Sequence, residues 1–509
     1  MNFLFDGLLH GQKRDAVFAR IPTSTPVRNY TYQDVLDVSG RFANTLVDFG
    51  VKPGDRVAVQ VPKSIEALVL YLATIRAGAV FLPLNTSYTV SEVEYFLKDA
   101  APTLFVLDPG KEAAFSDLLN GLGIQSATLG VWKNPETFAG SFVTQALKMS
   151  VEFDTISRDE NDLAAILYTS GTTGRSKGAM LSHLNLLSNA MCLKDYWQFT
   201  ERDVLLHALP IFHTHGLFVA TNTVLVAGSS MVFLPGFDAD KIISHLPTVT
   251  CMMGVPTFYT RLLDDTRLDL ELVTDVRLFV SGSAPLLAET HIAFEKRTGQ
   301  RILERYGMTE TNMNTSNPYD GERRAGTVGF PLPDVAIRVA DPESGALLPD
   351  GQVGVVEVKG PNVFSGYWKM PEKTKEEFRD DGFFITGDLG TIDEDGYLKI
   401  VGRSKDLIIS GGYNIYPKEI ELMLDDVDGV LESAVIGVPH ADFGEGVVGV
   451  LVAKPGNNLD EEEILFKIRD QIARFKQPKR LVVIDELPRN AMGKVQKNVL
   501  REQYSYLLS

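Results

Sequence analysis

The chain has 509 residues, which is enough for more than one domain with its own hydrophobic core. Its 66 acidic residues against 49 basic ones give a formal net charge of −17, which disfavours nucleic acid and anionic membranes as partners. Two cysteines, Cys192 and Cys251, exclude a disulfide framework and suit a reducing compartment. Because the sequence contains neither a membrane-spanning stretch nor a secretory signal, we expect a cytoplasmic protein without a membrane partner.

The first part of the chain alternates predicted helices and strands. Apolar residues recur at helical spacing from Thr31 to Gly50, and residues 51–61 then have the pattern of a strand. A second, apolar helix is expected from Ser64 to Ala77, followed by a short strand at 81–84. This alternation continues to about residue 330 and predicts an α/β fold with largely parallel sheets.

A glycine-rich loop, Tyr168–Gly178, separates an apolar run at 163–167 from a helix expected to begin near Ser182. Glycines let the backbone approach a ligand closely, and successive N–H groups in such a loop can converge on an anion. The loop mixes glycines, hydroxyl groups and cations: Thr169, Ser170, Gly171, Thr172, Thr173, Gly174, Arg175, Lys177 and Gly178. Such clusters are usually linkers, but their density directly after a strand favours a polyphosphate site. The spacing lacks the Gly-Lys-Ser/Thr of a Walker A loop, which argues against a P-loop NTPase.

Two segments further along could line a pocket. His213-Thr-His215 has no Cys or carboxylate partner at ligand spacing, so we interpret it as pocket wall and not as a metal site. In a helix expected to start near Pro256, four apolar residues share one face and Arg261 lies on its flank. Arg261 could therefore reach into a pocket, or it could be a solvated surface residue.

Tyr306-Gly-Met-Thr-Glu310 follows a strand predicted at 300–303. The aromatic ring could lie against a flat base, Gly307 allows close approach, and Glu310 could ligate a metal ion on the phosphates. A Thr-Glu pair alone is more often a helix cap, but together with the phosphate loop it favours a binding site.

After Gly354 the sequence changes to short β-like pieces, and from about Lys405 it forms a compact segment of mixed helices and strands. In that segment we expect helices near Pro417–Asp425 and Glu461–Phe475 and strands near Ala434–Val438 and Val447–Val452. We therefore expect a large N-terminal domain, residues 1–404, and a small mobile α+β domain, residues 405–509, with the active site in the cleft between them.

Three polar positions of this later part also deserve a functional interpretation. Asp388, at the end of Ile385-Thr-Gly-Asp388, could bind both hydroxyls of a ribose, although turns also favour Asp. Arg403 follows it in Gly402-Arg403, and Lys494 follows a flexible loop near the end of the chain. Each of these two cations, taken alone, is equally typical of a solvated loop.

Taken in order and spacing, these motifs resemble the acyl-adenylate-forming enzymes: acyl-coenzyme A synthetases, peptide-synthetase adenylation domains and firefly luciferase. The resemblance covers nearly the whole chain and rests on Tyr168–Gly178, Tyr306–Glu310, Thr386-Gly-Asp388, Gly402-Arg403 with Lys405, and Pro488–Lys494. It implies phosphate binding by Thr169 to Lys177, Mg²⁺ binding by Glu310, adenine packing on Tyr306, ribose binding by Asp388 and Arg403, a hinge at Lys405 and an adenylation role for Lys494. Asn414 stands where several relatives carry Arg, so a phosphate contact from that position is not expected.

The same resemblance suggests further site residues. Catalytic roles are implied for Thr169, Glu310, His213 and Lys494. Nucleotide contacts are implied for Ser283, Gly307 and Thr309. Contacts to the acid are implied for Arg261, His213, Thr214, Ser283 and Met308. Contacts to coenzyme A are implied for Gly411 and Gly412.

Within the family, residues 254–261, 213–215 and 304–316 look like those of malonyl-coenzyme A synthetases. A buried diacid keeps a distal carboxylate that must be paired, and Arg261 is the candidate. The implied reaction uses ATP, Mg²⁺ and coenzyme A and passes through malonyl-AMP. Open alternatives are methylmalonate or another short or medium acid, a non-catalytic nucleotide sensor, and an adenylation module, which would need a downstream carrier segment. Lys494 also resembles the lysine that is acetylated in related synthetases, which implies an acetyltransferase and a deacetylase as partners.

Overall fold

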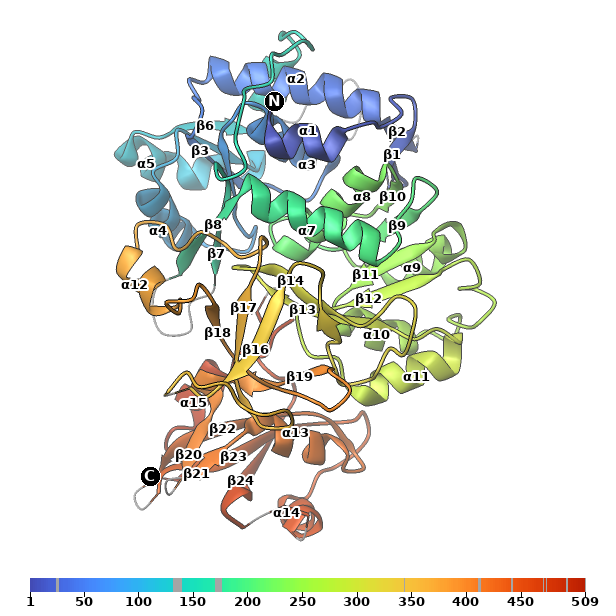
Figure 1. Ribbon diagram of the computed structural model, residues 1–509, viewed down its shortest axis with the longest axis vertical. Coiled ribbons are helices and arrows are strands. Elements are labelled where there is room, and N and C mark those ends of the chain that lie inside the picture. Colours follow the sequence, from blue (N-terminus) through green and yellow to red (C-terminus); the bar gives the residue numbers. More distant parts are fainter. Residues whose placement is uncertain are drawn as a thin grey trace. The chain divides into compact units, whose positions relative to one another are not determined.

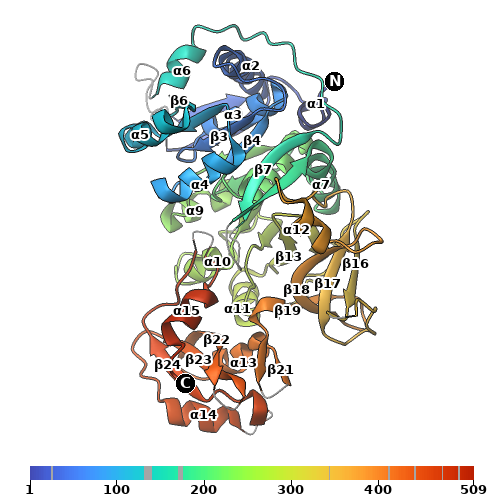
Figure 2. The same cartoon turned by 90° about the vertical axis from the view of Figure 1, so that its left-hand side faces the viewer.

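The computed structural model describes the chain except residues 24–26, 131–139, 170–175, 343, 411–412, 441–442, 470, 473, 491–492 and 509, and except the side chains of residues 413, 414 and 475. The chain forms two compact units (Figures 1 and 2). The first consists of Met1–Ala336 with Lys359–Phe384, and the second of Ile337–Val358 with Ile385–Ser509.

The first unit contains a six-stranded sheet in the order β6-β5-β3-β4-β7-β8. Its strands are β3 (Arg56–Gln60), β4 (Val80–Pro83), β5 (Leu104–Leu107), β6 (Gln125–Thr128), β7 (Leu163–Thr169) and β8 (Lys177–Ser182). All neighbours run parallel except β7 and β8, which are antiparallel. The segment that carries the glycine-rich loop is therefore a β-hairpin at one edge of this sheet.

A nine-stranded sheet forms the other half of the first unit, in the order β15-β14-β13-β12-β11-β9-β10-β1-β2. Its strands are β1 (Val17–Ile21), β2 (Arg28–Thr31), β9 (Val204–His207), β10 (Ser230–Phe233), β11 (Cys251–Gly254), β12 (Leu278–Ser281), β13 (Leu303–Met308), β14 (Asn312–Ser316) and β15 (Phe330–Pro331). The run from β1 to β13 through β10, β9, β11 and β12 is parallel. The carboxyl ends of these strands therefore meet at one edge, where ligands of parallel sheets usually bind.

Helices cover both sheets of the first unit. They are α1 (Phe3–Leu9), α2 (Tyr32–Asp48), α3 (Ile65–Arg76), α4 (Val90–Ala100), α5 (Glu112–Leu122), α6 (Ser141–Ala146), α7 (His183–Tyr196), α8 (Asn222–Ala227), α9 (Ala239–His245), α10 (Pro256–Leu263), α11 (Ala288–Thr298) and α12 (Pro371–Glu376), with short turns η1 (Pro109–Lys111), η2 (His215–Thr221) and η3 (Leu246–Thr248). Capping boxes at Thr31, Thr89 and Ser182 begin α2, α4 and α7.

The core of the first unit lies between and around its two sheets. Helices α4 and α5 bury their apolar faces on one side of the six-stranded sheet, and α2 and α6 cover the other side (Figure 2). Helix α3 is buried on all sides, since all of its residues except Arg76 are buried. Its Tyr71 ring contacts both Phe81 of β4 and Phe218 of η2. The two sheets therefore share one continuous core through α3.

The second unit contains two smaller sheets. The first joins β16 (Ala336–Ala340), β17 (Gly354–Lys359), β18 (Phe384–Ile392) and β19 (Leu398–Arg403) in that order. The second has the order β21-β20-β23-β22, with β24 beside β23; its strands are β20 (Ile408–Ser410), β21 (Tyr413–Ile415), β22 (Val430–His440), β23 (Gly444–Ala453) and β24 (Arg480–Ile484). Helices α13 (Pro417–Asp425) and α14 (Glu461–Arg469) pack on one face of it and α15 (Lys497–Tyr504) on the other, with short turns η4 (Ser404–Asp406) and η5 (Arg474–Lys476).

The predicted α/β class is confirmed, and three local predictions need correction. The helix expected to begin near Ser182 is confirmed as α7, for which Ser182 is the N-cap, but the strand β8 between the glycine-rich loop and this helix was not expected. Residues 177–182 form it by pairing with the long apolar strand β7. The strand expected at 300–303 begins at Leu303 and continues to Met308, so Tyr306 and Gly307 lie within a strand. The helix expected over 461–475 ends at Arg469.

The domain boundary expected at residue 404 is the point about which the C-terminal domain is predicted to move. The two compact units are instead defined by which residues pack together. In the compact division, residues 337–358 and 385–403 belong with the C-terminal unit. The boundary therefore stays a prediction. Within the described part of the chain, every helix is too short or too polar to cross a bilayer.

Candidate functional site

The glycine-rich loop is held at both ends by paired strands. Thr169 ends β7 and Lys177 begins β8, and the two residues face each other in the antiparallel register. The predicted phosphate ligands Ser170, Gly171, Thr172, Thr173 and Gly174 lie outside the described residues. The described ends of the hairpin nevertheless bring the Lys177 ammonium to the polar cluster described next.

Lys177 belongs to a charged cluster built from distant segments of the first unit. Its Nζ lies 2.8 Å from Oε1 of Glu377 and 4.0 Å from the centre of the Tyr367 ring. The Tyr367 hydroxyl lies 2.7 Å from Oε2 of Glu377 and 3.0 Å from Oε1 of Glu310. Glu310 is buried, and its carboxylate oxygens are the ligand type that Mg²⁺ prefers. The predicted phosphate cation and the predicted metal ligand are thus brought together through Tyr367.

The strand that leads to Glu310 is irregular where the adenine contact is predicted. The pairing of β13 with β14 shifts between Tyr306 and Gly307. A Cβ atom on Gly307 would lie 1.8 Å from the carbonyl oxygen of Asn312, so this close approach requires glycine. Tyr306 is almost fully buried, while Met308 and Thr309 remain partly accessible.

The His213-Thr-His215 segment begins a turn of π-helix, η2, a form that often marks functional sites. The turn is tied to the sheet by His207, whose Nε2 lies 2.9 Å from the Gly216 carbonyl oxygen. Lys63 holds the other side of that ring, with Nζ 3.0 Å from Nδ1 and 2.9 Å from the carbonyl oxygen of His207. Burial and the nearby Lys63 charge lower the pKa of His207 well below its usual value, so its ring is neutral.

The turn presents His215 to Ser283. His215 is fully buried, and its Nδ1 lies 3.1 Å from the Ser283 hydroxyl oxygen. Burial and the nearby charge of Arg305 lower the pKa of His215 well below its usual value, so its ring is neutral. Ser283 has a φ of +72°, a strained conformation that in non-glycine residues is concentrated at functional sites. Thr214 turns away and donates to Asn312 Oδ1 at 2.6 Å.

Arg305 lies beside this pair and is the most unusual charge in the first unit. Its side chain is buried, and its Nε and Nη2 atoms have no hydrogen-bond partner among the described residues. Burial lowers its pKa to about 9, so it remains a cation at neutral pH. A Cβ atom on Gly282 would lie 2.3 Å from the Arg305 Cζ atom, so the guanidinium packs directly on the backbone before Ser283.

Other buried polar atoms also have no partner within the described part of the chain: His215 Nε2, Ser281 Oγ, Thr311 Oγ1, Asn312 Nδ2, Asn314 Nδ2 and Thr315 Oγ1. All of them lie at the carboxyl ends of β12 and β13, on β14, or beside them. Because buried polar groups are normally hydrogen-bonded, this concentration indicates a site for water or a small polar ligand.

The structure places Arg261 differently from Arg305. Helix α10 buries Phe258, Tyr259 and Leu262, while Arg261 is exposed with its guanidinium 5.4 Å from the Phe237 ring centre. Phe237 in turn packs on Phe258. The helix and its apolar face are confirmed, and the role of Arg261 toward the acid stays a prediction.

The second unit pairs two other predicted residues. Asp388 of β18 faces Arg403 of β19 in register, and the Arg403 Nε lies 2.9 Å from Asp388 Oδ1. Thr386 accepts a hydrogen bond from the Asp388 N–H and so fixes the turn of this strand. The two residues predicted to hold the ribose are therefore adjacent. Gly411 and Gly412 lie outside the described residues.

Lys405 and Lys494 also lie near each other within this unit. Partial burial, together with the positive charges of Arg403, Lys494 and Arg501, lowers the pKa of Lys405 to about 8, although Asp406 opposes the shift. Lys494 follows a tight loop in which Asn490 accepts from the Lys494 N–H and Arg489 donates to the Gly493 carbonyl. The predicted hinge and the predicted adenylation lysine thus belong to one basic cluster.

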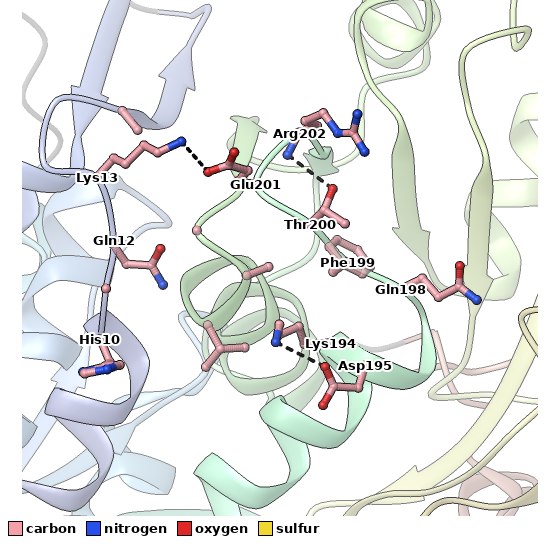
Figure 3. A pocket seen from close by; sticks show the side chains of 15 residues that line it. His10, Gln12, Lys13, Lys194, Asp195, Gln198, Phe199, Thr200, Glu201 and Arg202 are labelled. Carbon is pink, nitrogen blue, oxygen red and sulfur yellow. Dashed lines mark hydrogen bonds and ion pairs between the residues drawn. The ribbon is translucent and has the colours of Figure 1, made fainter.

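A pocket of about 820 Å³ in the first unit is lined by none of the predicted site residues (Figure 3). It lies where the segments 10–16, 194–202 and 226–228 meet. Two of its cations are paired with carboxylates of the same wall, Lys13 with Glu201 and Lys194 with Asp195. We therefore do not assign the chemistry to this pocket.

Comparison with known protein families shows which family the chain belongs to. The profile of the AMP-binding enzymes matches residues 10–368, and that of the AMP-binding enzyme C-terminal domain matches residues 419–494. The chain belongs to the AMP-binding enzymes. The family resemblance stated from the sequence motifs is therefore confirmed.

Individual members of the family differ in the acid they are named for. The chain is 35% identical over 487 residues to a malonate–CoA ligase of Arabidopsis thaliana, covering 89% of this chain and 79% of the relative. It is 34% identical over 529 residues to a long-chain-fatty-acid–CoA ligase of Bacillus subtilis, covering 95% and 92%. The crystal structure of ATP-bound MatB from Rhodopseudomonas palustris matches with a TM-score of 0.95 at 56% identity over the full length of both chains.

Sequence reasoning missed Arg305, His207, Lys63 and Glu377. Arg305 directly precedes the Tyr306–Glu310 motif and lies within the segment 304–316, and an alternating strand would have placed it on the opposite face from Tyr306. The other three carry no local signal, because their partners are distant in sequence.

The titration of Lys405 tests the electrostatics of the basic cluster. We expect the side-chain NMR signal of Lys405 to titrate with a midpoint near 8 in the folded protein. In urea the midpoint should move to about 10.4, the ordinary pKa of lysine. Between these values the folded chain binds fewer protons, so this group makes the free energy of unfolding rise with pH in that window. A folded-state midpoint above 10 would contradict the described packing.

Proposed function

We propose that this chain is a malonyl-coenzyme A synthetase, which converts malonate, ATP and coenzyme A to malonyl-coenzyme A, AMP and pyrophosphate. A malonate oxygen attacks the α-phosphorus of ATP, and pyrophosphate leaves. The thiol of coenzyme A then attacks the carbonyl of malonyl-AMP, and AMP leaves. Membership of the AMP-binding enzymes supports the adenylating step, and relatives named as malonate–CoA ligases support the acid.

The observation that favours malonate over a fatty acid as the substrate is the buried guanidinium of Arg305. Two of its nitrogens lack a hydrogen-bond partner among the described residues. Among the curated relatives the names alone do not decide, because a fatty-acid ligase is about as similar as the malonate ligases. The 56% identity to MatB is much higher. An alkyl chain would leave a buried cation unpaired, which is strongly unfavourable. A malonate carboxylate can accept two parallel N–H bonds from arginine and so satisfies it.

The neighbouring groups support the same assignment. We propose the neutral tautomer of His215 in which Nδ1 accepts the hydrogen bond from the Ser283 hydroxyl, so that the buried Nε2–H, which has no partner in the described chain, is a donor. A carboxylate oxygen between this donor and Arg305 would satisfy both. An added methyl group changes binding in a pocket only modestly, by roughly 1–3 kcal/mol, so methylmalonate remains the second candidate acid.

The other predicted residues divide the work on the nucleotide. The carboxylate of Glu310 fits Mg²⁺, which would neutralise charge on the phosphates when bound. Lys177 supplies a cation for the β/γ phosphates, and Tyr306 a face for adenine. The Asp388 carboxylate would accept hydrogen bonds from the ribose hydroxyls. Arg403 would orient that carboxylate, because its Nε already lies 2.9 Å from Asp388 Oδ1. Catalysis on this account is positioning and charge stabilisation.

In the second unit, Lys494 would stabilise the charge that develops as the carboxylate meets the α-phosphorus. Lys405 would be the hinge about which the predicted C-terminal domain, residues 405–509, reorients before coenzyme A transfer, a motion of the ordinary few-residue kind. Lys494 follows a loop, and we propose it as a site of acetylation by a lysine acetyltransferase, reversed by a deacetylase. Acetylation would remove the charge. Both unpaired cysteines fit a cytoplasmic location.

Arg305→Met tests the acid assignment. The variant keeps the length of the side chain but removes the charge, so we expect kcat/KM for malonate to fall by the equivalent of roughly 2–5 kcal/mol, with the KM for ATP little changed. The measurement is malonate-dependent pyrophosphate release. The matched control is Arg301→Met, an exposed arginine just before the same strand, which should behave as wild type.

The thermal midpoint separates this effect from misfolding. Because Arg305 lacks a full set of partners among the described residues, removing it should not lower the midpoint of the free protein, while malonate should cease to raise it. If Arg305→Met retained wild-type kcat/KM and Arg261→Met lost it, the carboxylate would belong to Arg261.

Lys494→Ala tests the assignment of the adenylation step. Losing one preorganised charge typically costs about 10²–10³ in rate, so malonate-dependent ATP–pyrophosphate exchange should fall by that factor. Conversion of supplied malonyl-AMP and coenzyme A should survive. Stoichiometric acetylation of Lys494, followed by mass spectrometry, should mimic the variant. Lys467→Ala is the control, because Lys467 is a lysine of the same unit that pairs with the exposed Glu463. An enzyme that stays fully active when acetylated would refute the role, and absent exchange in the wild type would favour a nucleotide sensor.

A further inference from the structure

Glu377 connects the predicted phosphate cation to the predicted metal ligand, yet it belongs to neither motif. Its Oε1 lies 2.8 Å from Lys177 Nζ and 3.2 Å from Lys373 Nζ, and its Oε2 lies 2.7 Å from the Tyr367 hydroxyl. Burial alone would raise the pKa of Glu377, but the hydrogen bonds from Lys177 and Tyr367 outweigh it and lower the pKa. Glu377 is therefore a carboxylate at neutral pH.

The position of Lys177 places two anions in competition for one cation. In the described structure its ammonium is neutralised by Glu377 and lies over the Tyr367 ring. Phosphate groups that approach Lys177 meet a carboxylate already paired with it, and like charges at this separation repel. The Lys177–Glu377 side chains are only about one-fifth exposed, at 21% and 20%, so water screens the repulsion incompletely.

The cluster also contains the group that makes an exchange of partners feasible. When Lys177 turns to a phosphate, Lys373 remains 3.2 Å from Glu377 Oε1 and keeps that carboxylate from being stranded. The Tyr367 hydroxyl has a single proton, which can serve Glu377 or Glu310 but not both. A change of charge at Glu377 therefore changes whether the Tyr367 hydroxyl donates to Glu310.

We propose that Glu377 is a positioning residue that holds Lys177 in the nucleotide-free enzyme and yields it to the phosphates of ATP. It keeps the affinity for ATP and pyrophosphate moderate, so that pyrophosphate leaves after adenylate formation. This inference rests on the proposed role of Lys177 as a phosphate ligand.

Glu377→Gln tests the proposal, because the amide keeps the shape and the hydrogen-bond acceptor but removes the charge. Coupling between two binding events commonly amounts to roughly 5- to 150-fold, so we expect the KM for ATP and the inhibition constant of pyrophosphate each to fall about fivefold or more. The KM for malonate should not change, and kcat should not rise. The matched control is Glu376→Gln, since Glu376 is exposed and contacts Lys373 but not Lys177.

A double-mutant cycle shows whether Glu377 acts through Lys177. In a Lys177→Met background, Glu377→Gln should no longer tighten nucleotide binding, measured by calorimetry with ATP and with pyrophosphate. Tightening that persists there, unchanged nucleotide affinity in the single variant, or a higher Mg²⁺ requirement would each overturn the proposal. Glu377→Ala repeats the test if the glutamine variant does not fold. If Lys177→Met alone leaves ATP binding unchanged, the phosphate role of Lys177 fails instead.

Discussion

A buried guanidinium without a full set of partners is the constraint on which this account depends. Arg305 lies on β13, the third strand from one edge of the nine-stranded sheet, packs on the backbone of Gly282, and has two nitrogens with no acceptor in the described part of the chain. Such a group is costly in a folded protein unless a ligand supplies the missing anion. The strained Ser283 and the neutral His215 beside it form a polar wall around the same point. On the proposed function, this group of polar side chains would contact the acid, where a fatty-acid enzyme needs apolar ones.

The cations predicted for the nucleotide are arranged in the opposite way. Lys177 is paired with Glu377, and Arg403 is paired with Asp388, so each meets its ligand by exchanging or sharing a carboxylate. A cation that is already paired binds a strongly charged ligand less tightly and more reversibly, because the ligand must compete with the existing carboxylate partner. In the proposed acid site, Arg305 has two nitrogens without a partner among the described residues, and it would favour an anion that carries only one or two charges. This contrast separates the two ligands of one enzyme by electrostatics alone.

Much of this architecture could be predicted from local pattern. The helices α2, α3, α10 and α13 follow apolar periodicity, with a side-chain cap at the start of α2 and α3 and a proline at the start of α10 and α13. The family motifs are contiguous in sequence, so both the helices and the motifs could be predicted. The strand β8 was missed because its stability comes from pairing with β7, and β13 was placed too early because a polar Arg-Tyr-Gly run has little strand signal. Glu377 and Lys63 could not have been found, since their partners Lys177 and His207 are far away in the chain. The loop residues 170–175 and 411–412 stay predictions.

The measurement that tests the central claim most directly is pyrophosphate release by the wild-type protein across a panel of mono- and dicarboxylic acids, with ATP, Mg²⁺ and coenzyme A present. If the guanidinium of Arg305 awaits a distal carboxylate, malonate should give the highest kcat/KM, methylmalonate should follow, and acetate, butyrate and octanoate should be poor substrates. A monocarboxylic acid that outperforms malonate would contradict the account, because no second carboxylate would then be available to pair with the buried charge.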